Sequence, residues 1–394
     1  MKNLVKVLLT ATLVGTVTLP HIVESKPNSL TPMGGNAFSA RAMDDSADQP
    51  KIQIAILLDS SNSMDGLIDQ TRSQLWEIVN SLADARKDGV VPKLEVALYH
   101  YGNDSLPSSE GYLRMLNGFT EDLDLVSEEL FGIQTNGGQE YAGWVIDAAT
   151  RQLDWSSDPD DVKAIFIAGN EPFNQGSMDW QEAIARAVNN DILVNTIYCG
   201  SGESEERNLW AMGSTKGNGD HVVINQDQQI AFIPSPYDEE ITLLNEQLNT
   251  TYIPYGDSGM VGMTRQLSAD ANSGVNIVTR GASKASEFYT NSTWDLVDAI
   301  EDDLVSLEEI ELAALPAPMQ TMTPEEREIY ITERQAERAE IQAKIQQLAE
   351  QREAYVAEQK RLESQGGDET LDSAMIQTIT EQLDLKGFTL NDSK

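Results

Sequence analysis

The sequence predicts an α/β fold, in which a doubly wound, mostly parallel sheet precedes an α-helical hairpin or coiled-coil extension. Residues 52–58 form an apolar run without a polar face, which is typical of a strand in a parallel sheet covered on both sides. Short β-rich runs then alternate with helical stretches as far as residue 224, the rhythm of a doubly wound sheet. Beyond residue 234 the pattern is helical and ends in a long, charged segment.

The elements of the sheet follow one another in order. A helix is expected over residues 66–84, then a strand over 94–101 and a short edge strand over 112–116. The remaining expected elements are helices at 122–131, 141–152, 178–189 and 203–212, and strands at 162–168, 192–199 and 221–224. Sheets of this kind bind ligands beyond the carboxyl ends of their strands. We therefore expect three loops to meet there, namely those after Leu58, around Thr135 and after Ala168.

The helical extension, 235–312, opens with serine, proline and acids, which cap a helix and suit its positive dipole end. A further helix is expected over 294–312, where apolar residues recur three and four apart. A proline-containing linker, 313–322, leads to a long charged helix, 323–365, which reaches roughly 60 Å at about 1.5 Å per residue. The C-terminal tail, 366–394, contains a short amphipathic helix.

The long helix has an interrupted apolar seam. Ile345 and Leu348 follow the three-and-four spacing, but Arg352 and Gln359 break it. An antiparallel helical hairpin with 294–312 as one arm is therefore the favoured structure. The alternative is a coiled coil through which the chain associates with itself.

The N-terminus predicts export. Residues 1–25 have the pattern of a signal peptide, with two lysines before an apolar run at 7–15 that is short for a membrane span of about 20 residues. Cleavage is expected after Ser25, and an uncleaved anchor is the alternative. Residues 26–50 are rich in Pro, Gly, Ser and Ala and are expected to form a disordered leader. We therefore expect a periplasmic or secreted protein whose mature chain has no transmembrane segment.

The overall charge limits the class of partner. The chain carries 27 basic and 64 acidic residues, a formal net charge of −37. Nucleic acid is excluded as a main partner, because its phosphates would be repelled. The single cysteine, Cys199, lies in an apolar run, so the chain has no internal disulfide and its stability must come from apolar packing and metal.

A polar loop follows the first strand and reads Asp59-Ser60-Ser61-Asn62-Ser63. A carboxylate followed by hydroxyls at alternate positions suits a hard cation such as Mg²⁺, with Mn²⁺ or Ca²⁺ as alternatives. Because this loop offers a single carboxylate, a bound ion would keep positive charge and could accept a carboxylate from another protein. The same residues could instead cap the helix that follows. The position at the end of a buried strand, and the hydroxyl of Thr135 beside glycines, favour the cation site.

Together these parts resemble the metal-ion-dependent adhesion site of von Willebrand factor A (VWA) domains, over residues 51–234. In that family an acid, two serines and a threonine from a second loop bind Mg²⁺ or Mn²⁺, and the aspartate of a Thr-Asp-Gly turn completes the site. The resemblance implies that Asp59, Ser61, Ser63 and Thr135 are ligands here.

One departure from the family affects the charge of the ion. The Thr-Asp-Gly turn is replaced by a Gly-Asn-Glu turn at 169–171. Asn170 is favoured at the aspartate's position and leaves the ion more electrophilic, whereas Glu171, the alternative, makes it less so. The wider chain is also similar to a group of periplasmic bacterial proteins that pair such a domain with a long charged helix, a group that brings no established activity. The stretches that carry this likeness are 63–70, 169–173 and 248–256.

These features predict an exported, metal-dependent protein-binding module. The cation would engage an Asp or Glu of a partner protein, while the helical extension spaces or assembles the units. The alternative is a structural envelope scaffold whose metal loop only stabilises the fold. A metal-dependent hydrolase is disfavoured, because the three histidines lack metal-ligand spacing and the sequence has neither a nucleophile elbow nor a phosphate-binding loop. We therefore expect that the protein is not an enzyme.

Overall fold

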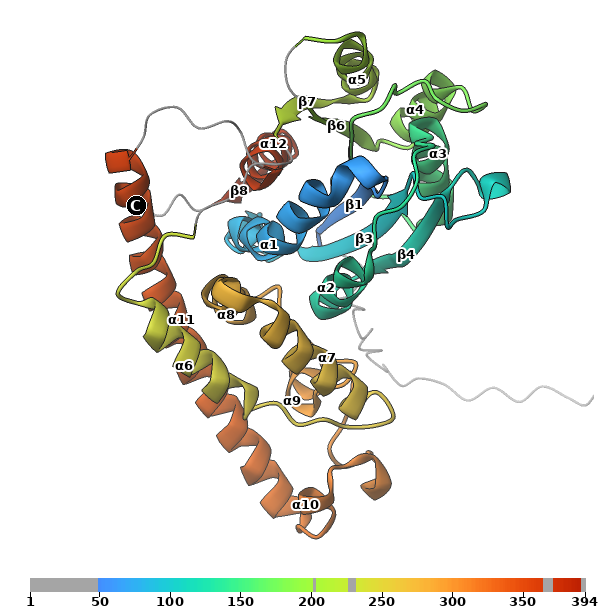
Figure 1. The fold of residues 1–394 in the computed structure, drawn as a ribbon. Helices are drawn as coiled ribbons and strands as arrows, with labels where there is room; N and C mark the ends of the chain where they lie inside the picture. The colour runs from blue at the N-terminus through green and yellow to red at the C-terminus, as the bar shows by residue number, and fades with distance from the viewer. Residues whose placement is uncertain (1–48, 201–202, 226–231, 364–370, 391–394) are drawn as a thin grey trace, which may run out of the picture. The chain divides into compact units, whose positions relative to one another are not determined.

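A computed structural model describes residues 49–200, 203–225, 232–363 and 371–390 (Figure 1). The predicted signal peptide, 1–25, and the predicted leader, 26–50, apart from its last two residues, lie outside the described residues. No helix of the described part is both long enough and apolar enough to cross a membrane.

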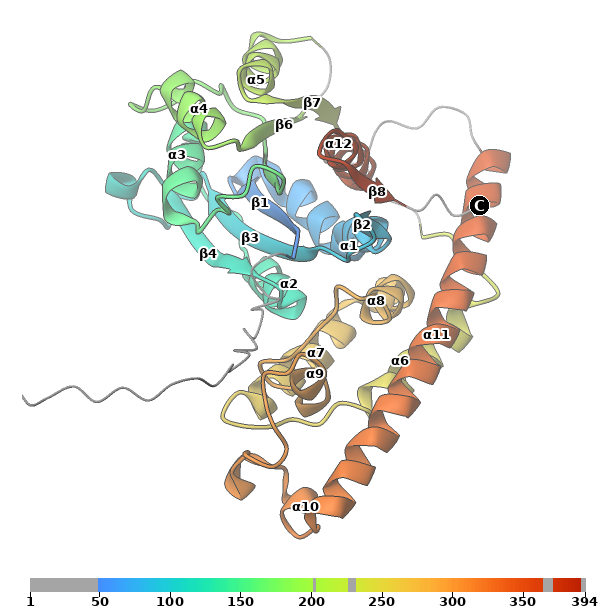
Figure 2. The same cartoon turned by 180° about the vertical axis from the view of Figure 1, so that it is seen from behind.

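Six strands form the central sheet in the order β4-β3-β1-β5-β6-β7, and only β4 runs antiparallel to its neighbour (Figure 2). The strands are β1 (Lys51–Asp59), β3 (Lys93–Tyr101), β4 (Leu113–Thr120), β5 (Val162–Gly169), β6 (Leu193–Cys199) and β7 (Asn218–Ile224). β1 lies between β3 and β5 and is buried at every residue after the first, which explains its continuous apolar sequence. The predicted fold class is confirmed.

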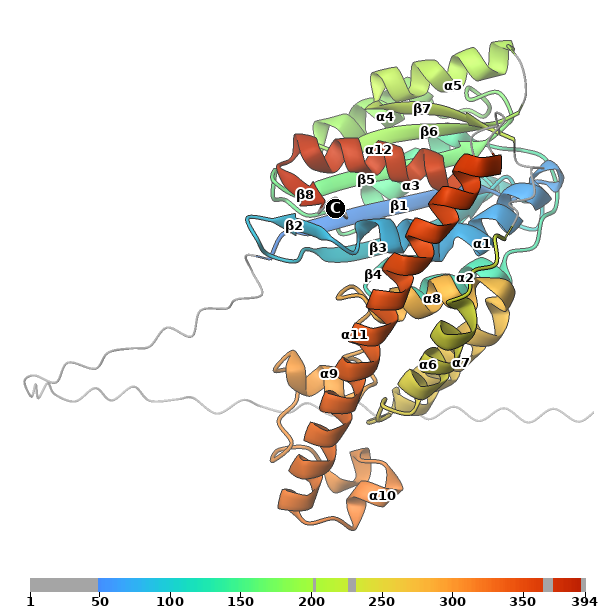
Figure 3. The same cartoon turned by 90° about the vertical axis from the view of Figure 1, so that its left-hand side faces the viewer.

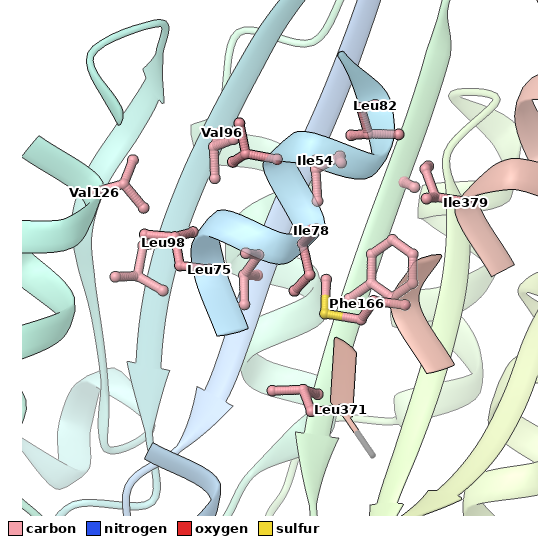
Figure 4. Close-up of a cluster of buried hydrophobic side chains, with 14 of the residues drawn as sticks. Ile54, Leu75, Ile78, Leu82, Val96, Leu98, Val126, Phe166, Leu371 and Ile379 are labelled. Atoms are coloured by element: carbon pink, nitrogen blue, oxygen red, sulfur yellow. The ribbon is translucent and has the colours of Figure 1, made fainter. Parts of the chain in front are cut away.

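Helices cover both faces of the sheet, and alternate residues of β1 point to opposite faces. Ile54 and Ile56 belong to the core beneath α1 and α2, whereas Ala55 and Leu57 belong to the core beneath α3, α4 and α5. In the first core, Leu75 and Ile78 of α1 lie over the strands (Figure 4). These helices are α1 (Asp65–Leu82), α2 (Leu123–Gly132), α3 (Ala142–Gln152), α4 (Trp180–Asn189) and α5 (Glu205–Lys216).

The C-terminal segment returns to this sheet. Helix α12 (Leu371–Leu385) lies beside the sheet (Figure 3) and contributes apolar side chains, among them Leu371 and Ile379, to the same core as α1 (Figure 4). Strand β8 (Phe388–Leu390) pairs antiparallel with β2 (Ala85–Lys87). Gln382 of α12 also exchanges side-chain hydrogen bonds with Asn195 of β6, at 2.6 and 3.2 Å. The short amphipathic helix predicted in the tail is thus a structural part of the α/β domain.

In the described residues between β7 and α12, the structure has six α-helices. They are α6 (Asp238–Asn249), α7 (Gly259–Asn272), α8 (Ile277–Lys284), α9 (Leu296–Glu301), α10 (Ala317–Gln320) and α11 (Pro324–Glu363). α11 lies antiparallel to α6: Arg352 binds Asp238 at 3.0 Å, while Arg338 donates to Thr251, beyond the other end of α6, at 3.1 Å. The seam residues Ile341, Ile345 and Leu348 are used within the chain, in a core shared with α6 and α8.

The prediction of a helix over 294–312 is wrong in its extent. Helix α9 ends at Glu301, and Asp303 has a left-handed backbone with φ of 55°. Three consecutive acids, Glu301 to Asp303, stand at the negative end of the helix dipole, which disfavours continuation. The helical hairpin is therefore formed mainly by α11 and α6 rather than by α11 and the segment 294–312.

Candidate metal centre

The Asp-x-Ser-x-Ser loop stands at the carboxyl end of β1, at the centre of the sheet. Asp59 is fully buried, and its Oδ1 accepts a hydrogen bond from the Ser61 backbone N–H at 2.8 Å. The hydroxyls of Ser61 and Ser63 lie 3.1 Å apart. A short 3-10 turn, Asn62–Met64, then leads directly into α1. The loop thus gathers one carboxylate and two hydroxyls over three alternate residues.

The second predicted loop lies against the first. The Asn62 backbone N–H donates to the Gly137 carbonyl at 3.1 Å, and the Asn136 N–H donates to the Ser60 carbonyl at 3.0 Å. The Thr135 hydroxyl itself donates to the side chain of Asp65, at the start of α1. The loops meet as predicted, while the role of Thr135 as a ligand stays a prediction.

The third loop follows β5. The Nδ2 atom of Asn170 lies 3.2 Å from the hydroxyl oxygen of Ser63. Glu171 is held by its neighbours: its carbonyl accepts from Trp210 Nε1 at 2.8 Å, and its carboxylate accepts from Gln175 Nε2 at 3.2 Å. Asn170 is therefore beside the serine hydroxyls, which is the arrangement that the favoured alternative requires.

Sequence reasoning missed Glu140, which lies just before α3. Its side chain is buried, at 4% exposure. A methyl group placed on Gly102 would be 2.7 Å from Glu140 Cγ and 2.8 Å from Asp59 Oδ1, so both carboxyl side chains border the same point. Within the described structure, neither Asp59 Oδ2 nor Glu140 Oε2 has a hydrogen-bond partner, although both atoms are buried. Its burial, which a sequence pattern does not reveal, distinguishes Glu140 from an ordinary helix-start acid.

The two buried carboxyl groups of the site have raised pKa values. Burial raises the pKa of Asp59 to about 8, and the negative charge of Glu140 adds to this rise. Burial likewise raises the pKa of Glu140 to about 7, with a contribution from the charge of Glu171. Buried carboxylates without a counter-ion are costly, and a bound cation removes that cost. The oxygen-rich donor set therefore fits a hard divalent cation.

Hydroxyl and amide oxygens are needed to complete such a site. Among the residues that the structure describes, no group of three His, Cys, Asp or Glu side chains could hold a metal ion by itself. The hydroxyls of Ser61 and Ser63 lie 3.1 Å apart, and Asn170 Oδ1 lies 3.4 Å from the Ser63 hydroxyl, so neutral oxygens are present in this loop. This composition, few carboxylates with hydroxyls, is one that Mg²⁺ accepts together with water.

His100 lies on β3 behind the metal loop, with its Nδ1 2.9 Å from the hydroxyl of Ser60. Burial, assisted by the charge of Arg114, lowers the pKa of His100 to about 4. The unfolded chain takes up this proton near pH 6.5, so the His100 contribution to stability is complete above pH 6.5 and falls as the pH drops towards 4. Between pH 7 and 4 we expect wild type to lose roughly 2–3 kcal/mol of unfolding free energy relative to His100→Gln, measured by urea unfolding. A difference between the two proteins that is independent of pH would contradict this expectation.

Comparisons with known proteins found structures of low similarity. No family model and no curated protein matches the sequence. A von Willebrand factor type A structure from Catenulispora acidiphila is similar at 13% identity and a TM-score of 0.35, over 45% of this chain and 39% of that chain. Proximal thread matrix protein 1 from the mussel byssus, with a zinc-occupied MIDAS motif, shows 13% identity and a TM-score of 0.36, over 46% and 43% of the two chains. The pilus adhesin SpaC from Lactobacillus rhamnosus GG shows 11% and 0.34, over 46% and 28%.

This chain matches less than half of the length of each of these three proteins. The mostly parallel sheet, the edge position of β4 and the polar loop after β1 are features that the sequence predicts. The central domain of this protein therefore has the doubly wound, mostly parallel α/β fold that its sequence predicts, with the polar loop at the carboxyl end of β1.

Proposed function

We propose that this protein is an exported, metal-dependent protein-binding module of the VWA type. Asp59, Ser61, Ser63 and Asn170 are the proposed ligands of a divalent cation, together with an oxygen of the second loop, where the sequence predicts Thr135. Mg²⁺ is the first choice, and Mn²⁺ or Ca²⁺ are the alternatives. When bound, the cation accepts a carboxylate from an Asp or Glu of a partner protein. The observation that carries the proposal is the buried oxygen Asp59 Oδ2, which has no hydrogen-bond partner in the described structure and belongs to a loop whose two serine hydroxyls lie 3.1 Å apart.

The proposed ligands have different roles in binding the cation. Asp59 supplies the charge, and its Oδ1 is already oriented by the Ser61 backbone N–H. The loop lies at the rim of the sheet, where Ser63 and Asn170 are partly open to solvent, so a partner can reach the site. The helical region, whose longest helix spans roughly 60 Å at about 1.5 Å per residue, is proposed to space or assemble the units. Export rests on residues 1–25, and N-terminal sequencing of the protein from cells should begin at Lys26.

Titration calorimetry with Mg²⁺ tests the proposal. Wild type should release or absorb heat on binding, and Asp59→Ala should weaken cation binding at least roughly 100-fold, because it removes a charged ligand. Asp69→Ala is the matched control, since its side chain on the following helix is 74% exposed. In EDTA, Asp59→Ala should melt no lower than wild type, because the substitution removes a buried, uncompensated acid. Equal heats of Mg²⁺ binding for wild type and Asp59→Ala would contradict the proposal.

A second measurement separates partner binding from a scaffold. Pull-down from envelope extract with wild type and Asp59→Ala should capture a protein only with wild type and only in the presence of the cation. If a chelator lowers the melting temperature but leaves capture unchanged, the metal loop stabilises the fold and the scaffold alternative holds.

A further inference from the structure

We infer that Glu140, rather than Thr135, supplies the ligand of the second loop, so that the cation is held by two carboxylates. The inference rests on the proposed function, since it names a residue of the same site. It begins from Thr135, whose hydroxyl is already directed at Asp65 on the first turn of α1. The side chain of this loop that reaches the buried end of β1 is instead Glu140, five residues further on.

The backbone around the two acids is shaped to bring them together. Gly102 follows β3 with a left-handed φ of 74°, and a side chain there would run into Glu140 and Asp59 at 2.7 and 2.8 Å. On the other side of Asp59, a side chain on Gly169 would lie 3.2 Å from Asp59 Cβ and 2.7 Å from the Tyr101 hydroxyl. Two glycines thus leave room for a pair of acidic side chains at one end of the sheet.

The unpartnered oxygens indicate what the pair binds. Buried carboxylate oxygens in folded proteins are nearly always hydrogen-bonded, because an unsatisfied one is costly. Here Asp59 Oδ2 and Glu140 Oε2 both lack a partner within the described structure. Two neighbouring acids repel each other when both are ionised, so without a cation they retain a proton, whereas a cation satisfies both unpartnered oxygens in the ionised form. A single divalent cation can bind both oxygens. The hydroxyl of Ser61, which lies between Asp59 and Ser63 on the loop after β1, would be a further ligand.

The loop that follows β5 holds the Glu140 backbone in this position. The Glu140 backbone N–H donates to Gln175 Oε1 at 3.2 Å, and the other end of the same amide donates to the Glu171 carboxylate at 3.2 Å. Gln175 therefore fastens the Glu140 backbone to the loop that follows β5. Because Gln175 and Trp210 hold Glu171, this acid acts as a neighbouring negative charge and positioning residue.

Two carboxylates change the charge balance of the proposed site. Asp59 and Glu140 together carry two negative charges, which neutralise a divalent cation, whereas a hydroxyl in the second loop would leave it with one positive charge. Cation affinity rises with the number of charged ligands. The cation is therefore retained before any partner arrives, and the loaded protein is the state that meets its partner.

Calorimetry with MgCl₂ or CaCl₂ alone tests the assignment on three full-length variants. Glu140→Gln keeps the shape but removes the charge, and it should weaken cation binding at least roughly 10-fold, whereas Thr135→Val should change it less than about 3-fold. A loss with Thr135→Val that equals or exceeds the loss with Glu140→Gln overturns the inference while leaving the proposed function intact. If wild type does not bind the cation, both the inference and the proposed function are overturned. Asp59→Ala gives the calorimetric signal expected of a protein without the site.

Thermal melting gives a second readout that a merely structural role would not produce. In EDTA, Glu140→Gln should melt at or above the wild-type temperature, because a neutral amide replaces a buried acid that has an unpartnered oxygen and borders Asp59. In saturating cation the order should reverse, because only wild type gains the full binding free energy. A variant that melts below wild type by the same margin in both conditions overturns the inference.

Discussion

Ending the chain at Glu363 is expected to unfold the α/β domain, although the sheet and its loops all precede that residue. The truncation removes five side chains from the core beneath α1, each at most 2% exposed: Leu371, Met375, Ile379, Leu383 and Phe388. At about 1.5–3 kcal/mol for each buried side chain, their loss amounts to roughly 8–15 kcal/mol. This is as large as the whole stability of a typical domain, about 5–15 kcal/mol. Circular dichroism and urea unfolding should therefore show no cooperative transition for the truncated chain.

Single substitutions in α12 provide a graded version of this experiment. Ile379→Ala should reduce the unfolding free energy by about 2–4 kcal/mol, because Ile379 is 1% exposed and lies in the core. Leu385→Ala, at the exposed end of the same helix, should change it by less than about 0.5 kcal/mol. A truncated chain that still melts cooperatively at the wild-type temperature would show that α12 is dispensable for the fold.

The role of α12 illustrates which features of this fold a sequence can predict. Local patterns sufficed for β1, whose continuous apolar run requires cover on both faces, and for the short helix near the C-terminus. They did not reveal that this helix packs on a sheet whose last strand ends at Ile224, because its amphipathic pattern does not specify a partner. Long-range partners are decided by complementary surfaces, which periodicity does not encode.

The helical region shows the same limit. The antiparallel pairing of the long helix was predicted, but its main partner is α6 rather than the segment 294–312. Arg352, which was taken as an interruption of the apolar seam, makes an ion pair with Asp238 of α6. A charge in a seam is a defect only when no opposite charge faces it, and the facing residue is 114 positions away in the sequence.

The candidate site was predictable to a similar extent. The loop after β1 and its meeting with the loop around Thr135 follow from topology, because the carboxyl ends of parallel strands share one edge of the sheet. The burial of Glu140 does not follow from any spacing in the sequence. It depends on Gly102, a residue on a different strand connection, which leaves space for the acid beside Asp59.

Arg280→Met is expected to have the second-largest effect, because Arg280 is the centre of a buried charge cluster between α8 and the α/β domain. The side chain is completely buried and binds Asp124 of α2 at 2.6 Å and Asp270 of α7 at 2.5 Å. Its guanidinium also lies over the ring of Trp76 on α1, 4.6 Å from the ring centre. Removing Arg280 would deprive Asp124, which is 1% exposed, of its ion-pair partner and leave it the hydrogen bond from the Tyr289 hydroxyl at 2.6 Å.

Breaking a buried ion pair from one side costs about 3–5 kcal/mol, whereas replacing both partners by apolar residues can be nearly neutral. Urea unfolding should therefore show a loss of about 3–5 kcal/mol for Arg280→Met, and the double variant Arg280→Met/Asp124→Leu should recover much of it. Lys344→Met is the control, because it breaks an ion pair with Glu240 in which both side chains are about half exposed, and it should cost less than about 1 kcal/mol. If Arg280→Met cost no more than Lys344→Met, the buried charges around Arg280 would contribute nothing to the attachment of the helices after β7 to the α/β domain.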